Sequence, residues 1–143
     1  MRWFLLAIFW TTLTSAALEI RSSVDFDEKV RYSSRVFVVE FYSDFCGFCA
    51  EFSPTWRKFV QEASRLESAR VNVDDEDGAK LASDLGVLDL GIPAVLIFTT
   101  ETYLPLMAGQ LFPVSRLLKL VYRETKAKGL SIDRDGYFLK TSS

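Results

Sequence analysis

Histidine is absent from this 143-residue chain, and cysteine occurs only twice. Every mechanism that uses an imidazole as general base or as metal ligand is therefore excluded. A structural zinc site needs four cysteine or histidine ligands, so two cysteines cannot complete one within a single molecule. We expect neither a metal ion nor a bound cofactor.

An excess of one charge is also lacking. The chain has 17 basic and 19 acidic residues, a net charge of −2, and no long block of like charge. No basic patch for nucleic acid is predicted. The length, together with a hydrophobic content of 49%, is typical of a single globular domain with a real core.

The first residues form a short apolar stretch, "WFLLAIFW", after Met1 and Arg2 and before the small residues "TTLTSAA". This pattern predicts a secretory signal peptide over residues 1–17, with cleavage after Ala17. The alternative, an uncleaved membrane anchor, is disfavoured because a bilayer-spanning helix needs roughly 20 apolar residues. We expect a mature chain that starts at Leu18, has no membrane contact, and enters an oxidising compartment.

Hydrophobic periodicity predicts an α/β fold of order β-α-β-α-β-α-β-β-α. The expected elements are a short strand from Leu18, a small helix over 24–30, a buried strand over 35–43, a helix over 46–66, a strand over 69–74, a helix over 77–86, a buried strand over 94–98, an edge strand over 102–109 and a helix over 113–129. Residues 130–143 form a tail with a turn signal at Asp135–Gly136 and no predicted element.

Both cysteines, Cys46 and Cys49, lie in "VVEFYSDFCGFCAEFSPTW", residues 38–56. A disulfide between residues three apart closes a tiny loop and would stabilise the fold little. The pair stands where a buried strand gives way to a helix, so Cys46 lies at the helix N-terminus, where backbone N–H groups favour a thiolate. Cys49, one turn on and more buried, can resolve a mixed disulfide formed by Cys46. The spacing favours a redox pair over a structural staple.

The same stretch resembles the active-site segment of the thioredoxin superfamily, and specifically a catalytic domain of the protein disulfide isomerases, which reads E-F-Y-A-P-W-C-G-H-C. Further matches are Pro54, "RVNVD", "GIPAVLIF" and Gly109, so the resemblance covers about residues 19–127. It implies a thioredoxin-like fold: a single α/β domain over residues 18–129, with a central mixed β-sheet flanked by helices.

The resemblance also implies roles for residues outside the cysteine pair. Glu40 takes the position of the family's buried acid, which accepts and returns the proton of the second cysteine; alternatively it lies near a strand end and reaches solvent. Arg70 replaces a lysine that pairs with this acid, and is either its partner or a solvated charge. The Ile92–Pro93 bond is expected to be cis, with Ile92 backbone groups pairing an extended substrate.

Within the active-site motif, Gly47 is retained but Phe48 replaces the family's histidine. That histidine stabilises the reduced form, so its loss predicts a more reducing pair. Phe45 replaces a tryptophan. Phe45, Phe48 and Ile92 either form an apolar patch for unfolded chains, or the two phenylalanines pack locally.

Two further departures from the family are structural. The segment between Gly86 and Pro93 is two residues longer than in the family. Leu111 stands where the isomerases often have an arginine.

These features predict an enzyme, a protein disulfide isomerase or thiol–disulfide oxidoreductase, acting on unfolded or disulfide-containing proteins. Glutathione or another oxidoreductase is the expected exchange partner. The chain ends "LKTSS" rather than in a retention signal, so the endoplasmic reticulum lumen and secretion both remain open. The alternative is a non-enzymatic client-binding module whose disulfide stays closed. A sulfhydryl-oxidase-like thioredoxin domain is a third hypothesis, because "PTW" occurs there too.

Overall fold

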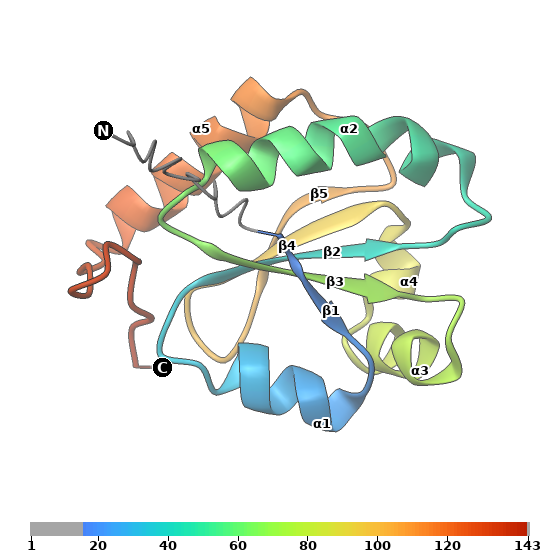
Figure 1. The fold of residues 1–143 in the computed structure, drawn as a ribbon, viewed down its shortest axis with the longest axis horizontal. Coiled ribbons are helices and arrows are strands. Elements are labelled where there is room, and N and C mark those ends of the chain that lie inside the picture. The colour runs from blue at the N-terminus through green and yellow to red at the C-terminus, as the bar shows by residue number, and fades with distance from the viewer. Residues whose placement is uncertain (1–15, 143) are drawn as a thin grey trace, which may run out of the picture.

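The structure, a computed structural model, describes residues 16–142, so the predicted signal peptide lies outside the described residues up to residue 15. A five-stranded sheet with helices on both faces forms the domain (Figure 1). The elements in chain order are β1 (Leu18–Ile20), α1 (Ser23–Phe26), the π-helical turn η1 (Asp27–Arg31), β2 (Phe37–Tyr42), α2 (Gly47–Glu62), β3 (Glu67–Asn72), α3 (Glu76–Asp84), α4 (Val87–Leu90), β4 (Ala94–Phe98), β5 (Leu104–Ala108) and α5 (Val114–Ala127).

The sheet is mixed, with strand order β1-β3-β2-β4-β5. The first three of these strands are parallel, whereas β4 runs antiparallel to both β2 and β5. β5 contains Pro105 and lies at the edge, as predicted, because proline cannot donate a ladder hydrogen bond. β2 lies at the centre, and five of its six residues are buried. Its near-continuous apolar sequence follows from this position, since helices cover both faces.

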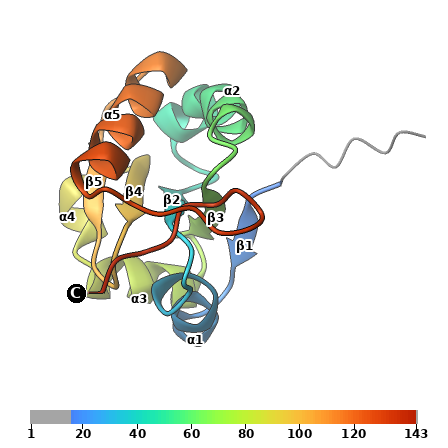
Figure 2. The same cartoon turned by 90° about the vertical axis from the view of Figure 1, so that its left-hand side faces the viewer.

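Two layers of helices sandwich the sheet (Figure 2). α2 and α5 cover one face, where Val38, Phe52, Trp56 and Leu117 belong to one core cluster. α1 and α3 cover the other face, which Phe37, Val39 and Phe41 of β2 help to fill. Alternation along β2 therefore sends even-numbered side chains toward α2 and odd-numbered ones toward α1 and α3.

The predicted order of elements is confirmed, with three local differences. The segment after Gly86 is not an open loop: Gly86 adopts a φ of 72° and the chain then forms the four-residue helix α4, whose Val87 is fully buried. The helix expected to reach residue 66 ends at Glu62, although Ala63 and Leu66 still belong to the core beneath it. The small helix after β1 contains a π-helical turn.

The tail, to which the sequence assigned no element, packs against the end of the sheet opposite the β2–α2 loop (Figure 1). Its turn lies where Asp135–Gly136 predicts it, with the Gly136 N–H donating to the Asp133 carbonyl. Backbone hydrogen bonds fix the remainder: Val36 N to Phe138 O, Phe138 N to Arg65 O, Lys140 N to Ser34 O and Thr141 N to Thr99 O. The tail therefore closes the core beneath α2 and β2.

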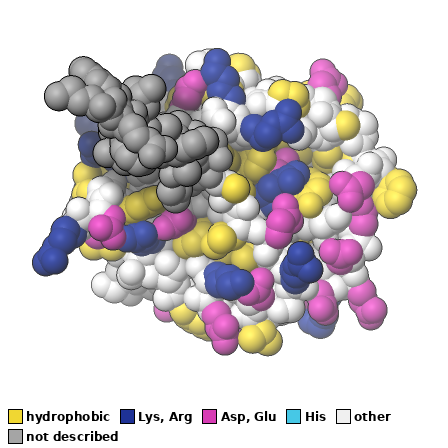
Figure 3. Space-filling view, viewed as in Figure 1, with side chains coloured by type: hydrophobic (Ala, Val, Ile, Leu, Met, Phe, Trp, Pro, Cys, Tyr) yellow, Lys and Arg dark blue, Asp and Glu magenta, His cyan; other side chains and the backbone are white. Residues whose placement is uncertain are grey.

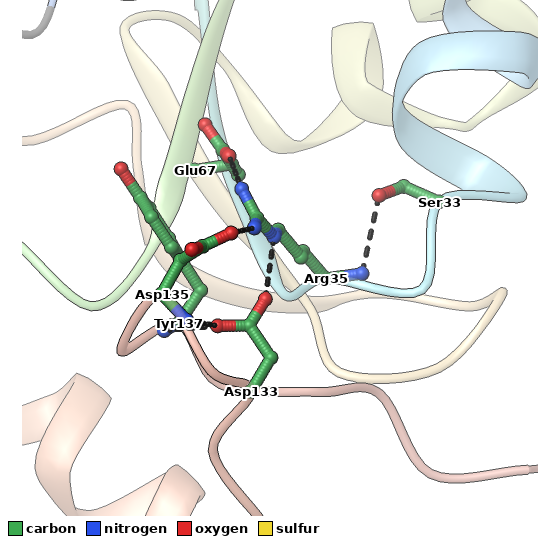
Figure 4. Close-up of polar contacts among 6 residues, drawn as sticks. All are labelled: Ser33, Arg35, Glu67, Asp133, Asp135 and Tyr137. Atoms are coloured by element: carbon green, nitrogen blue, oxygen red, sulfur yellow. Dashed lines mark hydrogen bonds and ion pairs between the residues drawn. The ribbon is translucent and has the colours of Figure 1, made fainter.

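Arg35 is the main side-chain link between the tail and the domain (Figure 4). Its guanidinium lies 2.7 Å from both Asp133 Oδ2 and Asp135 Oδ2 and 2.9 Å from Glu67 Oε1, and it stacks over the Tyr137 ring. Hydrogen bonds from the Tyr137 N–H, and then from Arg35, hold the pKa of Asp133 below its ordinary value. Because the pKa of Asp133 is lower in the folded protein than in the unfolded chain, ionised Asp133 stabilises the fold at pH values above its unfolded-state pKa. This stabilisation is lost as the pH falls through its folded-state pKa.

Replacing Arg35 by methionine is expected to lower the midpoint of thermal unfolding and to expose the tail to proteases. The loss should be largest at neutral pH and should shrink in acid, where the three carboxylates become protonated. Arg134→Met is the matched control, because Arg134 is exposed and makes no ion pair within residues 16–142. Equal midpoints for the two variants would contradict the role given to Arg35.

Candidate active site

Cys46 and Cys49 lie at the start of α2, just beyond the carboxyl end of β2. Cys46 is the N-cap residue, and its Sγ accepts a hydrogen bond from the Cys49 N–H at 3.1 Å. Both side chains are free thiols; Cys46 is partly exposed, whereas Cys49 is only 4% exposed. The accessible thiol therefore has the N-terminus of helix α2 directed at it.

Cys49 is a poor thiolate in this environment. Burial is the largest of the causes that together raise the pKa of Cys49 to about 12, and the interaction with Cys46 and the charge of Glu40 act in the same direction. A thiol with such a pKa is almost entirely protonated at neutral pH. Cys49 therefore needs a base that removes its proton at the moment it attacks.

Glu40 lies on β2, pointing to the face covered by α2, and is fully buried. Arg70 Nε donates to Glu40 Oε2 at 2.7 Å, so of the two interpretations of Arg70 the paired one holds. The other oxygen, Oε1, has no hydrogen-bond partner among the described residues. The alternative in which Glu40 reaches solvent is wrong, because β2 is central and covered on both faces.

The pKa of Glu40 is raised above its ordinary value of 4.5. Burial is the largest cause, and it outweighs the opposing effect of Arg70; the charge of Glu19 adds to the rise. A carboxyl group with a raised pKa and a free buried oxygen can take up a proton and give it back.

The Ile92–Pro93 bond is cis and lies at the same end of the sheet as the cysteines. Ala94, the next residue, is the antiparallel partner of Phe41, and Cys46 follows shortly after β2 ends. The Pro93 carbonyl accepts from the Gly109 N–H at 3.1 Å. Within residues 16–142, the N–H and C=O of Ile92 make no hydrogen bond to another backbone group. They are therefore available to pair with an extended segment of another chain.

The aromatic side chains of the motif face solvent. Phe45 is 91% and Phe48 is 60% exposed, so neither packs locally as the alternative interpretation required. Gly47 is the first residue of α2, and an added Cβ would have no heavy atom within 4 Å. Local sterics therefore do not require glycine between Cys46 and Phe48.

A carboxylate that the sequence analysis did not single out holds the β2–α2 loop. Asp74 follows β3; its Oδ1 accepts from the Ser43 hydroxyl at 2.6 Å and its Oδ2 from the Asp44 N–H at 2.7 Å. Ser43 Oγ also accepts from the Phe45 N–H at 3.0 Å. No local signal marked this support, because Ser43 and Asp44 lie 31 and 30 residues from Asp74 in the sequence.

Acidic side chains gather at this end of the molecule, over the segment that joins β3 to α3 (Figure 3). Asp74, Asp75, Glu76 and Asp77 form a run of four exposed acids, and Asp44 adds another beside the cysteines. The rim of the site thus combines apolar rings with negative charge. A basic or apolar segment is the kind of chain that fits such a rim.

Within residues 16–142, no group of three or more acidic or thiol side chains is arranged to hold a metal ion. In the same part of the chain, no helix has the length and hydrophobicity needed to cross a bilayer.

Comparison with known proteins assigns the fold. The Thioredoxin family model matches residues 17–120. Protein disulfide-isomerase like 2-2 of Arabidopsis thaliana is 32% identical over 92 residues, 64% of this chain and 20% of its own length. Protein disulfide-isomerase A6 of Homo sapiens is 34% identical over 76 residues, 51% of this chain and 17% of its own length. The chain therefore spans about a fifth of the length of each of these two relatives.

Among solved structures, the J-Trx1 fragment of ERdj5 superimposes with a TM-score of 0.66 at 23% identity, over 81% of this chain and 53% of that one. At this identity the likeness concerns the fold. It agrees with the mixed sheet and the two helical layers described above.

Proposed function

The chain belongs to the thioredoxin family, and on that premise we propose that it is a thiol–disulfide oxidoreductase of the secretory pathway, similar to a protein disulfide isomerase. The observation that carries the proposal is the arrangement at the start of α2. An accessible thiol, Cys46, caps the helix and accepts from the Cys49 backbone N–H; the Cys49 thiol is buried; and the buried acid Glu40 influences Cys49 electrostatically.

In the first step, the Cys46 thiolate attacks one sulfur of a client disulfide. A bond forms between Cys46 and that sulfur, the client S–S bond breaks, and the other client sulfur leaves as a thiolate that takes a proton from solvent. Helix α2 assists because its first N–H groups stabilise negative charge on Cys46.

In the second step, Cys49 transfers its proton to Glu40 and attacks Cys46. The Cys46–Cys49 disulfide forms, the mixed disulfide breaks, and the second client thiolate is released. The client gains two electrons and this protein loses two. Run in reverse, the same steps donate a disulfide to a dithiol client, and glutathione or another oxidoreductase resets the pair.

The clients are unfolded or disulfide-containing proteins. The exposed rings of Phe45 and Phe48, next to the unpaired backbone of Ile92, offer an apolar surface and a strand edge for an extended segment. The predicted signal peptide over residues 1–17 supports a secretory location, in the endoplasmic reticulum lumen or outside the cell.

The proposal is tested by the reduction potential of the Cys46–Cys49 pair, measured in glutathione buffers with the thiols trapped and counted. A value between about −150 and −270 mV is expected, because exchange catalysts lie in this span. A value below about −300 mV would contradict the proposal, because the compartment could not open such a disulfide.

That second outcome would favour a client-binding module whose disulfide stays closed. The observation in favour of this alternative is the exposure of Phe45 and Phe48, which suits client binding whether or not the thiols react. Retention of client binding by a variant lacking both cysteines would then be the expected companion result.

The residue at position 48 is expected to set where the reduction potential of the Cys46–Cys49 pair lies within the range given above. Replacing Phe48 by histidine is expected to raise the potential by about 30 mV, a tenfold change in the exchange constant, because an imidazolium beside Cys46 stabilises the reduced form. Phe48→Leu is the control, since it removes the ring without adding charge, and should leave the potential unchanged. Equal potentials for the two variants would show that residue 48 does not act on Cys46.

A further inference from the structure

Three charged residues form a row across the parallel strands β1, β3 and β2. Glu19 and Glu40 are the register partners of Arg70 on its two sides. Arg70 Nε contacts Glu40 Oε2 at 2.7 Å, whereas Arg70 Nη1 contacts Glu19 Oε1 at 3.3 Å. One guanidinium is thus shared between a fully buried carboxylate and one whose side chain is 46% exposed.

Tyr42 contacts both Arg70 and Glu19 and so holds the guanidinium between the two carboxylates. The Arg70 guanidinium carbon stacks 3.8 Å from the centre of the Tyr42 ring, and the Tyr42 hydroxyl donates to Glu19 Oε2 at 3.3 Å. Burial raises the pKa of Tyr42 to about 12, so this hydroxyl keeps its proton and remains a donor across the physiological range. Tyr42 therefore holds both Glu19 and the guanidinium in place.

The other groups around Glu40 give little compensation. Its register partner on β4 is the apolar Val95, and Met107 of β5 lies in the same cluster. Helix α2 contributes Cys49, whose thiol interacts electrostatically with Glu40. Arg57 of α2 lines a cavity of about 350 Å³ together with Glu19, Ser53, Trp56 and Arg70, but its own hydrogen bond goes to Ser53. Arg70 is therefore the principal cation acting on Glu40.

Arginine cannot give up its proton, so an undivided Arg70–Glu40 pair would hold Glu40 firmly as a carboxylate. We propose that Glu19 is a positioning residue of this site: it draws part of the Arg70 guanidinium away from Glu40, and its own negative charge further opposes ionisation of Glu40. Glu40 thereby remains able to take up the Cys49 proton and return it. This role rests on the proposed function, in which Glu40 serves Cys49.

The test is a Glu19→Gln variant of the full-length, reduced protein. Glutamine keeps the shape and the acceptor for Tyr42 but removes the charge. The titration midpoint of the Glu40 carboxyl carbon, followed by ¹³C NMR, is expected to move to lower pH. Glu28→Gln is the matched control, because it removes one exposed carboxylate from η1, away from the row, and should not move the midpoint.

A second readout is the rate at which Cys49 releases glutathione from a Cys46–glutathione mixed disulfide, measured against pH. The acid limb of this profile should move to lower pH in Glu19→Gln, together with the NMR midpoint, and should disappear in Glu40→Gln. A merely structural role of Glu19 would change the rate at all pH values without moving the limb.

The outcomes separate this inference from the function on which it rests. An NMR midpoint for Glu40 that is the same in Glu19→Gln and Glu28→Gln would overturn the role of Glu19, whatever the protein catalyses. A midpoint that moves in Glu19→Gln alone supports the role. If it moves while no variant releases glutathione, the coupling of Glu19 to Glu40 stands and the oxidoreductase function falls.

Discussion

A Cys49→Ser variant is expected to accumulate as a stable mixed disulfide through Cys46. Cys46 is the accessible thiol at the helix N-terminus, so it attacks the client disulfide as before. The hydroxyl at position 49 occupies nearly the same volume as the thiol but cannot displace the client sulfur. Incubation with oxidised glutathione or a disulfide-containing peptide should therefore give one covalent adduct per chain, seen by intact mass and reversed by a reducing agent.

In the matched variant, Cys46→Ser, the rate of thiol–disulfide exchange is expected to fall to the uncatalysed rate of a free thiol in solution. Burial raises the pKa of Cys49 to about 12, so the remaining thiol is protonated as well as inaccessible. A Cys46→Ser variant that forms the adduct as readily as Cys49→Ser would reverse the roles given to the two cysteines. The double variant controls for adducts that do not involve this pair.

The sequence predicted those parts of the site that depend on one contiguous stretch. Cys46 and Cys49 were assigned as accessible and buried thiols because a buried strand is followed directly by a helical repeat, and the structure has α2 beginning at Gly47. Such local patterns suffice because strand and helix periodicities alone place a side chain on a face. For Glu40, the resemblance implied a buried acid and a solvent-reaching alternative was left open; the structure buries it in the central strand.

Parts of the site that depend on register could not be predicted. The partner of Arg70 was left open, since the ion pair joins residues 30 apart through the alignment of β2 and β3. Glu19 was not considered at all: it lies on a three-residue edge strand, 51 residues from Arg70. Asp74 escaped notice for the same reason, as its partners belong to a loop 30 or more residues away.

Helix α4 and the structure of the tail were also not predicted from the sequence. Helix α4 has four residues, too few for a hydrophobic period to appear. The tail is held by the ion pair of Arg35 with Asp133, which are 98 residues apart in the sequence. No local sequence signal therefore distinguished the tail from an unstructured chain end. Long-range ion pairs and backbone bridges decided the conformation in both the tail and the row around Arg70.

The Glu40–Arg70 pair leads to a second prediction, in which two substitutions have effects of opposite sign on stability. Glu40→Leu removes a fully buried carboxylate that has one oxygen without a partner, and leucine fills a similar volume. Arg70 retains Glu19 and some contact with solvent, so it is not left as a buried, unpaired charge. We expect the free energy of unfolding at neutral pH to rise by about 1–3 kcal/mol.

Arg70→Met instead leaves the buried Glu40 without its cation, and the free energy of unfolding at neutral pH is expected to fall by about 3 kcal/mol. The exposed pair Lys58–Glu62 supplies the control, since Glu62→Leu and Lys58→Met alter partly exposed charges 3.8 Å apart and should change stability little. Urea unfolding of all four variants compares them directly. Stability changes of the same sign in Glu40→Leu and Arg70→Met would contradict the argument.

The pH dependence of the Glu40→Leu gain provides an independent check of its origin. Because burial raises the folded-state pKa of Glu40 above 4.5, the folded protein binds the proton more tightly than the unfolded chain. Stability of the wild type therefore falls as the pH rises from about 4.5 to the folded-state value, and the gain from Glu40→Leu should grow over that window and then stay constant. The same variant should release mixed disulfides about 100-fold more slowly, because Cys49 has lost its base. A protein that becomes more stable and slower through one substitution identifies Glu40 as a group retained for chemistry rather than for folding.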